Sequence, residues 1–345
     1  MSTPRPPLTH LVTGVAGQDG VHLARLLHAA GHRVVGTVSD ASEPETLVYL
    51  EGIELAAHDV RDSRGFARLL ERVRPDVVHN LAALSSVGAS WEAEELTLAV
   101  NRDAVVAMLA VLREHAERHG SAPRFLQASS SEIFGPATPG AVLDEDSPLA
   151  PVSPYGRAKA AAHEAVVAAR ASGLDAANLV LFGHTGPLHA AHFALPTTCR
   201  QAVEVAAGRR ERLELRDPSV ERDWGGAADF MAAWAQVALS PDPAQDVVVA
   251  TGQLHRLGEV ATWALAAAGA PADPRLIGDL AGPEQVPARP HDVTGVRGDA
   301  SRLAARYAWT PSRQLRAVIE TMVAVEEQRL RTGVRHRVGY LDTLA

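Results

Sequence analysis

A tyrosine and a lysine four residues apart, Tyr155 and Lys159, have the types and the spacing of a catalytic pair. On a helix, residues four apart lie on one face. A nearby ammonium group lowers the pKa of a phenol, so that the phenol can act as a base toward a substrate hydroxyl near neutral pH. Such pairs are common on protein surfaces, so the segments that position this pair decide its meaning.

A glycine-rich turn near the amino terminus provides that context. It follows an apolar segment at 8–12 and precedes a helical pattern at 21–30. Because Gly14 and Gly17 have no side chain, the backbone can approach a pyrophosphate, and the start of the next helix supplies positive potential. The turn predicts a dinucleotide site; an ordinary tight turn is the alternative. The candidate contacts are Gly14, Gly17, Gln18, Asp19 and Gly20.

Three later strand ends offer further contacts to a dinucleotide. The segment 36–40 ends in Asp40 and contains no arginine. An acid there suits a ribose diol, whereas an arginine suits a 2′-phosphate, so the segment favours NAD unless Asp40 merely caps the next turn. Asp59 and Val60 are placed to touch an adenine, and plain packing is the alternative. A path of small residues for the cofactor follows the fourth strand, at Leu81, Ala82 and Ala83.

Hydroxyl groups and a carboxylate follow the fifth predicted strand, in the run 129–132. They would emerge at the carboxyl edge of the sheet, facing the helix of Tyr155. Ser130 beside the phenol can share a proton with a substrate oxygen, and Glu132 offers a second acid or base. A serine cluster after a strand can also simply cap a helix.

Two arginines in the second half of the chain are candidates for binding a diphosphate. Arg222 lies in an Arg-Asp-Trp run, and Arg289 precedes a proline. Planar guanidinium groups suit phosphate oxygens. Surface ion pairs are the alternative for both.

Composition excludes several classes of protein. The net charge of -8 provides no footprint for nucleic acid. We see no apolar run of the roughly 20 residues that span a membrane, and no signal-peptide core at the start. The single cysteine, Cys199, excludes internal disulfides and multi-cysteine metal sites, which suits a cytoplasmic protein. His184, His189 and His192 lack the spacing of a ligand set, so no metal site is expected.

The order of the predicted elements indicates a Rossmann-like α/β fold. Strand patterns alternate with helical patterns in the first half, which is typical of a doubly wound parallel sheet. Beyond Gly183, longer loops and dispersed helices predict a smaller α/β substrate-binding lobe. We expect a dinucleotide-binding domain at 1–183 and this lobe at 184–345, with elements that can return to the first domain. The predicted strands are 8–12, 33–38, 53–57, 77–80, 124–128 and 178–182, and the predicted helices of the first half are 20–30, 63–73, 93–119 and 155–172.

Together, these motifs resemble the extended short-chain dehydrogenase/reductase family of NAD-dependent epimerases and dehydratases, most closely its GDP-mannose 4,6-dehydratases. The likeness runs from about residue 8 to 310. The Gly-Gln-Asp-Gly and Arg-Asp-Trp-Gly runs are fairly specific for these dehydratases, and the other motifs mark the wider family. The matching segments are 13–20, 80–88, 127–135, 153–155, 222–225 and 289–290.

The resemblance implies a redox-neutral reaction on a nucleotide-diphosphate sugar, a GDP-hexose. Tyr155, aided by Ser130 and held by Lys159, would take the proton of the sugar 4-hydroxyl while hydride leaves C4 for bound NAD or NADP. Glu132 would then remove the C5 proton and help to expel the C6 hydroxyl as water, after which the hydride returns to C6. The resemblance also places Tyr155, Lys159 and His184 against the cofactor, and Ser85, Ser130, Arg222 and Arg289 against the substrate.

The chain departs from the family pattern at both ligands. Ser39 and Asp40 stand where arginines usually bind NADP, and the segment 183–189 lacks the usual paired arginines. In the family that segment helps to bind the cofactor and joins dimers into tetramers, so NADP and a tetramer are both in doubt. Leu84 and Ser86 replace the usual glutamine and histidine near the substrate, which leaves another sugar or another reaction open.

The helices 93–119 and 155–172 resemble those that pair in family dimers, so a homodimer is expected. The apolar positions taken to face outward are Val105, Met108, Val111, Ala161, Val166 and Ala169. Packing of these residues against the sheet is the alternative.

Two other functions compete with the dehydratase. An epimerase acting at C4 or a neighbouring carbon of a GDP-sugar would share the C4 oxidation, but simple epimerases of the family usually have a small or hydroxyl residue in place of Glu132. A cofactor-sensing regulator would keep the fold without the chemistry. The intact set of Tyr155, Lys159 and Glu132 argues against a regulator.

Overall fold

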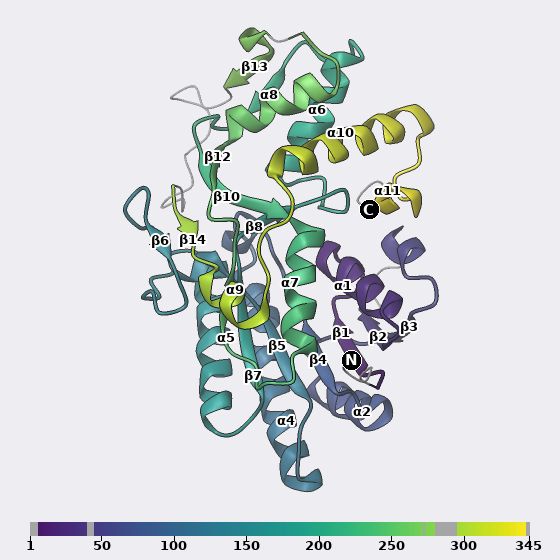
Figure 1. The fold of residues 1–345 in the computed structure, drawn as a ribbon, viewed down its shortest axis with the longest axis vertical. Coiled ribbons are helices and arrows are strands. Elements are labelled where there is room, and N and C mark those ends of the chain that lie inside the picture. Colours follow the sequence, from purple (N-terminus) through teal and green to yellow (C-terminus); the bar gives the residue numbers. More distant parts are fainter. Residues whose placement is uncertain (1–5, 40–44, 272, 280–294, 343–345) are drawn as a thin grey trace.

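A seven-stranded parallel sheet forms the centre of the molecule (Figure 1). The computed structural model describes residues 6–39, 45–271, 273–279 and 295–342. The strand order is β11-β7-β5-β4-β1-β2-β3, and all neighbouring pairs are parallel. The predicted doubly wound sheet is therefore confirmed. Its strands are β1 (Thr9–Thr13), β2 (Arg33–Val38), β3 (Glu54–Ala57), β4 (Val77–Asn80), β5 (Arg124–Ser130), β7 (Ala176–Leu181) and β11 (Val247–Val249).

Helices cover both faces of the sheet. On one face, α1 (Gln18–Ala29) and α7 (Ala227–Leu239) enclose a core that includes Val12. On the other face, α2 (Ser63–Val73), α4 (Ala104–His119) and α5 (Pro154–Ala171) enclose a core that includes Leu11. Successive side chains of a strand point to opposite faces, which is why these adjacent residues belong to different cores.

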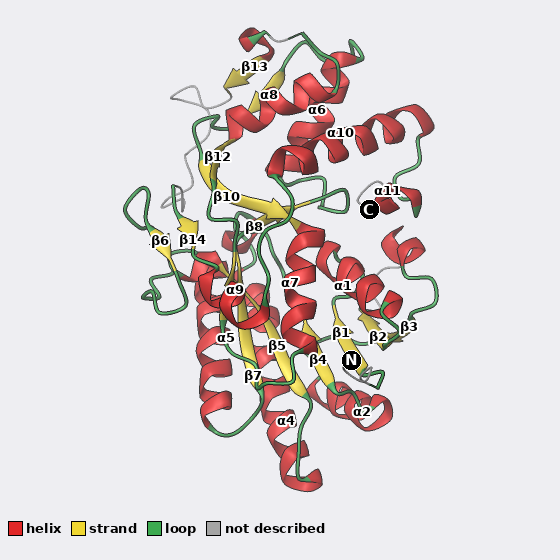
Figure 2. Cartoon of the chain, viewed as in Figure 1, coloured by secondary structure: helices red, strands yellow, loops and turns green. Residues whose placement is uncertain are grey.

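A smaller lobe lies above the carboxyl ends of the sheet strands (Figure 2). Its core is formed by α6 (Ala194–Ala206), α8 (Leu257–Ala267) and α10 (Leu315–Thr332), packed around residues such as Trp224. The predicted second α/β lobe is thus confirmed. Its strands are β8 (Gly183–Thr185), β10 (Glu221–Gly226) and β12 (Leu254–Arg256) in one sheet, and β9 (Leu213–Leu215) and β13 (Ile277–Asp279) in another.

The remaining elements are short. An unbroken helical stretch runs from α3 (Glu94–Leu98) through a π-helical turn (Ala99–Asp103) into α4. Single turns of 3₁₀ helix occur at Glu45–Tyr49, Ala89–Trp91, Ser131–Ile133 and Pro274–Leu276. The others are β6 (Val142–Leu143), β14 (Arg297–Gly298), α9 (Ser301–Tyr307) and α11 (Gly339–Asp342).

The chain crosses between the two layers more than once. Strand β11 pairs with β7 of the main sheet, and α7 packs against α1. Both elements come after the small strand β8. The sheet layer therefore contains segments from both sides of the boundary expected at residue 183.

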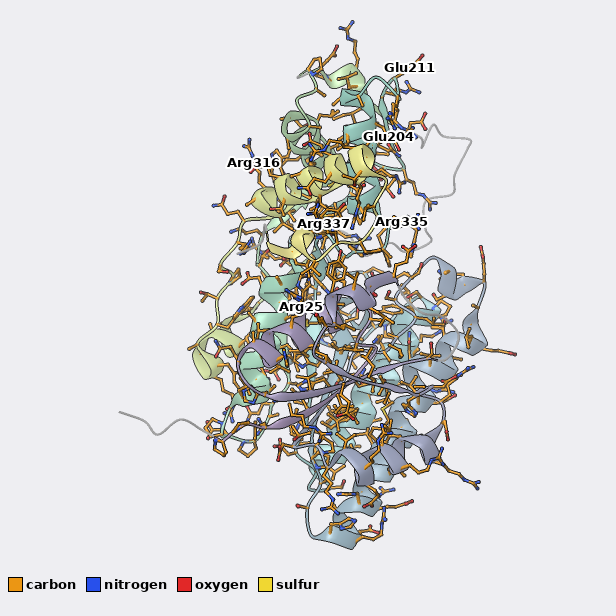
Figure 3. All side chains as sticks on the ribbon, turned by 90° about the vertical axis from the view of Figure 1, so that its right-hand side faces the viewer. Arg25, Glu204, Glu211, Arg316, Arg335 and Arg337 are labelled. Atoms are coloured by element: carbon orange, nitrogen blue, oxygen red, sulfur yellow. The ribbon has the colours of Figure 1, made fainter. Side chains whose placement is uncertain are left out.

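The carboxyl-terminal segment returns to the start of the chain. The Arg337 amide donates to the Tyr49 hydroxyl over 3.1 Å, and the Arg25 guanidinium donates to the Tyr49 carbonyl over 3.2 Å. Figure 3 shows Arg335 and Arg337 on the same side of the molecule as Arg25. Tyr49 therefore joins α1 to residues that follow α10.

The outward-facing surface expected on α4 and α5 is wrong for three of its residues. Val105, Met108 and Val166 are buried in the core against the sheet. The large apolar side chains of these helices that are exposed are instead Val106, at 48% exposure, and Val167, at 39%. A helix has about 3.6 residues per turn, so an error of one position turns the assigned face toward the core.

Candidate active site

The glycine-rich turn fits a group that must approach the backbone closely. Gly14 has a φ of 68°, and a Cβ on it would lie 2.8 Å from the Ala82 backbone nitrogen. A Cβ on Gly20 would lie 2.4 Å from the Gly14 carbonyl oxygen. Helix α1 starts at Gln18, and no described side chain caps it. Its first amide groups are thus available to an anion such as a pyrophosphate.

A chain of buried hydrogen bonds crosses the carboxyl edge of the sheet. The Thr13 hydroxyl donates to the Asn80 amide oxygen over 2.6 Å, and the Asn80 amide nitrogen donates to Gln127 over 2.7 Å. Gln127 then donates to the Ala128 carbonyl over 2.9 Å. The same carbonyl accepts the Lys159 ammonium over 2.8 Å. The ends of β1, β4 and β5 are thereby linked to the lysine.

Tyr155, Ser130 and Glu132 meet where β5 ends and α5 begins. The Tyr155 phenol hydrogen-bonds to Ser130, and the Glu132 carboxylate is near enough to act on its charge. Ser153 caps α5 by accepting the Gly156 amide over 2.9 Å, which fixes the first turn that carries the tyrosine. The grouping expected from the two sequence motifs is thus present.

The expectation that the pKa of Tyr155 lies below its ordinary value is wrong for the chain alone. Burial raises the pKa of the phenol above its ordinary value, and the Glu132 and Asp19 carboxylates act in the same direction. The bond to Ser130 opposes them only in part. Burial also lowers the pKa of Lys159, to about 8. Its ammonium lies 5.8 Å from the centroid of the tyrosine ring and is held by a carbonyl.

A buried ion pair joins the glycine turn to the smaller lobe. His184 Nδ1 donates to the Phe182 carbonyl over 2.8 Å, and His184 Nε2 donates to the Asp19 carboxylate over 3.0 Å. Because neither partner can donate, both ring nitrogens carry protons and the imidazole is cationic. Burial opposes this charge, yet Asp19 raises the pKa of His184. His184, predicted at the cofactor, thus holds the residue at the start of α1.

The loop after β4 is anchored by a residue that the sequence analysis missed. Asn101, in the π-helical turn, accepts the Leu84 amide and donates to the Leu84 carbonyl, both over 2.9 Å. Ser85, which follows Leu84, is exposed. A buried asparagine within a largely apolar helical run is the signal that could have revealed Asn101. The backbone of Leu81 and Ala82 packs behind Gly14, and Ala83 is half-buried.

The Arg-Asp-Trp run lies on β10. Asp223 accepts amide groups from Thr251, Gly252 and Gly298 over 2.8 to 3.1 Å. Burial raises the pKa of this carboxylate. Arg222 is half-buried and pairs in register with His255 of β12. The run therefore fixes the loops around β10 as well as presenting an arginine.

The remaining residues predicted to contact the cofactor or the substrate have other partners or lie outside the described residues. The Arg61 side chain donates to Asp59 over 3.0 Å, and this bond lowers the pKa of Asp59 to about 2. Val60 packs against the core below α2. Asp40 and Arg289 lie outside the described residues.

Gly183, the first residue of β8, lies against the Trp224 side chain of the smaller lobe. A Cβ there would lie 2.6 Å from the Trp224 ring. A larger side chain would displace the tryptophan and, with it, the second core. Packing at the base of the smaller lobe thus requires a glycine at position 183.

Comparison with known proteins places the chain. A family model for GDP-mannose 4,6 dehydratase matches residues 11–322. The chain belongs to this family. It is 31% identical to GDP-mannose 4,6 dehydratase 1 of Arabidopsis thaliana, over 98% of this chain and 95% of the relative. It is 30% identical to the GDP-mannose 4,6-dehydratase of Vibrio cholerae, over 94% of this chain and 95% of the relative.

Solved structures show the same fold in this family's wider group. The UDP-glucose 4-epimerase of Thermus thermophilus, solved with NAD, superposes with a TM-score of 0.79 at 27% identity. The match covers 95% of this chain and all of that one, 100%. Within the described part of the chain, every helix is too short or too polar to cross a membrane.

Proposed function

We propose that the protein is a nucleotide-sugar 4,6-dehydratase that acts on a GDP-hexose such as GDP-mannose. The observation that carries the proposal is the meeting of Tyr155, Ser130 and Glu132 at the end of β5, in a chain of this family. One phenol and one carboxylate at a single site match the two deprotonations, at the 4-hydroxyl and at C5, that a 4,6-dehydration requires.

The glycine turn and the first turn of α1 would hold the pyrophosphate of a nicotinamide cofactor. When bound, the cofactor supplies a hydride acceptor and donor, and the positive charge of its oxidised ring lowers the pKa of a neighbouring phenol. We propose NAD, because the segment 36–40 contains Asp40 and no arginine. The epimerase of Thermus thermophilus was solved with NAD, which supports a nicotinamide dinucleotide but not the choice between NAD and NADP.

Tyr155 would take the proton of the sugar 4-hydroxyl, with Ser130 bridging the two oxygens. Lys159 stays largely protonated at neutral pH, because its pKa is about 8, and its charge stabilises the phenolate that forms. The bond from Lys159 to the Ala128 carbonyl fixes the ammonium on the tyrosine's side of the sheet edge.

Glu132 would act second. Once C4 is a ketone, the hydrogen at C5 is acidic, and a carboxylate can remove it and then protonate the departing C6 hydroxyl. Glu132 lies in the single turn of 3₁₀ helix that Ser130 caps, so that both groups are set by the same strand end. A single residue thereby serves as base and acid. Return of the hydride to C6, with a solvent proton at C5, would complete the reaction and leave the cofactor oxidised as at the start.

A C4 epimerase of a GDP-sugar is the second candidate. It is supported by the solved UDP-glucose 4-epimerase at 27% identity and by the exposed Leu84 beside Ser85, where the family usually has a glutamine. Glu132 has no task in simple epimerisation, and this favours the dehydratase.

We also propose a homodimer built on α3, α4 and α5. These helices expose Leu96, Val106 and Val167, and the 3₁₀ turn that precedes α3 exposes Trp91. Size determination of the wild-type protein and of Val106→Asp tests this: a wild-type dimer that the aspartate converts to a monomer is expected.

The deciding experiment is mass spectrometry of GDP-mannose incubated with the protein in deuterated water, with NAD and NADP in separate reactions. Loss of one water with entry of deuterium into the sugar supports the dehydratase and identifies the cofactor. A product of the same mass that separates from GDP-mannose by chromatography supports the epimerase. Unchanged GDP-mannose with both cofactors overturns the substrate assignment.

A further inference from the structure

Two histidines and a glutamate converge on the opposite side of the sheet from the glycine turn. His115 and His119 are four residues apart near the end of α4, and Glu71 lies near the end of α2, which packs against α4. One ligand atom from each residue lies within 4.8 Å of the other two. In Figure 1 these helix ends lie at the far end of the molecule from the smaller lobe.

The Glu71 carboxylate lies close to a ring nitrogen of each histidine. Glu71 Oε1 is 3.2 Å from His119 Nε2 and 3.7 Å from His115 Nδ1. The two imidazole rings are 4.3 Å apart at their centroids. Around a tetrahedral ion with bonds of about 2.0 Å, adjacent ligand atoms are about 3.3 Å apart. The two separations from Glu71 need little adjustment to reach that value, and the two histidine nitrogens lie within 4.8 Å of each other.

His115 provides an independent sign that the cluster is incomplete. Its Nδ1 atom is buried and has no hydrogen-bond partner among the described residues. A buried polar atom without a partner costs about 1 to 3 kcal/mol unless a water or an ion satisfies it. The three side chains also line a hollow of about 490 Å³, so that an ion and its water ligand have room.

We propose that Glu71, His115 and His119 bind one divalent transition-metal ion, with Zn²⁺ as the best match. Imidazole nitrogens and one carboxylate are ligands that Zn²⁺ accepts in tetrahedral sites, with water in the fourth position. The ion would link α2 to α4 and give His115 Nδ1 the partner that it lacks among the described residues. None of the candidate active-site residues lines this hollow, so the site is independent of the proposed sugar chemistry.

Arg118 competes with the ion for the Glu71 carboxylate. Its guanidinium lies 3.2 Å from the Glu71 oxygen that would bind the metal. The Arg118 side chain is 53% exposed, so it can turn toward solvent when an ion arrives. Metal binding therefore competes with an existing salt bridge, and removing Arg118 should increase the affinity for the metal.

The test is titration of the full-length protein, without a histidine tag, with Zn²⁺ by calorimetry and with Co²⁺ by visible absorption. We expect one ion per chain and a tetrahedral Co²⁺ spectrum. His119→Ala and Glu71→Gln should weaken binding by at least the about tenfold that loss of an outer-shell partner causes. Both side chains are 45% exposed, so these variants should fold.

Two further variants separate this site from adventitious binding. His28→Ala removes an exposed histidine on α1 and should leave the affinity unchanged, whereas Arg118→Gln should increase it. Zn²⁺ should raise the unfolding temperature of the wild type but not of Glu71→Gln. Absence of stoichiometric binding, equal affinity in wild type and His119→Ala, or equal loss in His28→Ala would overturn the proposal.

Discussion

Buried histidines differ in charge between the edge of the sheet, where one is cationic, and its interior, where two are neutral. At the edge, His184 lies between a carbonyl and the Asp19 carboxylate, and its pKa is raised. In the interior, His79 accepts the Trp234 indole N–H over 2.8 Å and faces His10 Nδ1 over 2.9 Å. Burial lowers the pKa of His79 well below its ordinary value.

The partners, not the depth of burial, decide the difference. Because His79 Nδ1 accepts from Trp234, its proton lies on Nε2 and is donated to His10. Both interior rings are therefore neutral, and burial, with the nearby His32, lowers the pKa of His10 to about 4. At the edge, the Asp19 carboxylate instead raises the pKa of its histidine partner, His184, which is cationic. We infer that the edge is arranged to hold charge for chemistry and the interior to hold helix α7 on the sheet.

The largest effect expected of a single substitution at the edge is on catalysis. Tyr155→Phe removes the proposed base, which should lower turnover by at least about 100-fold. The unfolding temperature should stay close to that of the wild type, because the ring remains packed. Tyr307→Phe, which removes a phenol that accepts an amide outside the site, is the control and should keep its activity. Turnover by Tyr155→Phe within threefold of wild type would contradict the proposed role.

Asp19→Asn should abolish the charge at His184. Loss of this ion pair should cost about 3 kcal/mol at pH 7, the lower end of the range for buried pairs, because the histidine can release its proton. The raised pKa of His184 stabilises the fold fully below its unfolded pKa of about 6.5, and this contribution disappears as pH rises through the folded pKa. Urea unfolding across pH 6 to 9 should therefore show a decline in the wild type that Asp19→Asn lacks. The lowered pKa of Asp19 acts at the acid end, where its contribution is lost as pH falls.

For the interior histidines we predict the opposite pH dependence of the unfolding free energy, namely a loss of stability as pH falls. The pKa of His10 is about 4 in the fold and about 6.5 in the unfolded chain, so stability falls as pH drops from about 6.5 toward 4. Between pH 7 and pH 5 this one group should remove about 2 kcal/mol. His10→Gln keeps an acceptor for His79 and should reduce the slope of the unfolding free energy by one proton. The same slope in both proteins would sink the assignment of His10 as a buried neutral group.

Thr13→Val is expected to have the smallest effect. It removes the hydroxyl that donates to Asn80 and accepts the Ala82 amide. Two polar groups lose one partner, which should cost about 1 kcal/mol of stability. Turnover should change by less than about threefold, since the lysine keeps its own carbonyl. A much larger loss of turnover in stopped-flow assays would mean that the whole hydrogen-bond chain positions the lysine.

The sequence sufficed for the parts that local patterns encode. The strands of the first half lie within two residues of their predicted ranges, because alternating or continuous apolar runs bounded by turns have few other solutions. The grouping of Tyr155 with Ser130 and Glu132 followed from two strand and helix ends that must meet at the carboxyl edge of a parallel sheet.

Contacts between distant segments could not be predicted in this way. Asp19 and His184 are 165 positions apart, and nothing in either segment indicates a pair. The pKa of Tyr155 depends on burial, which a four-residue spacing does not reveal. The metal-binding cluster likewise takes its third ligand from another helix, Glu71 of α2.

The central claim is that one site carries out two successive deprotonations, of the 4-hydroxyl and then of C5, and that Glu132 performs the second. The most direct test is Glu132→Gln with GDP-mannose and the cofactor that wild type uses, followed by absorbance of the reduced nicotinamide and by mass spectrometry in deuterated water. We predict that reduced nicotinamide forms and that no water is lost, because C4 oxidation needs only Tyr155. Loss of water at the wild-type rate would contradict the account.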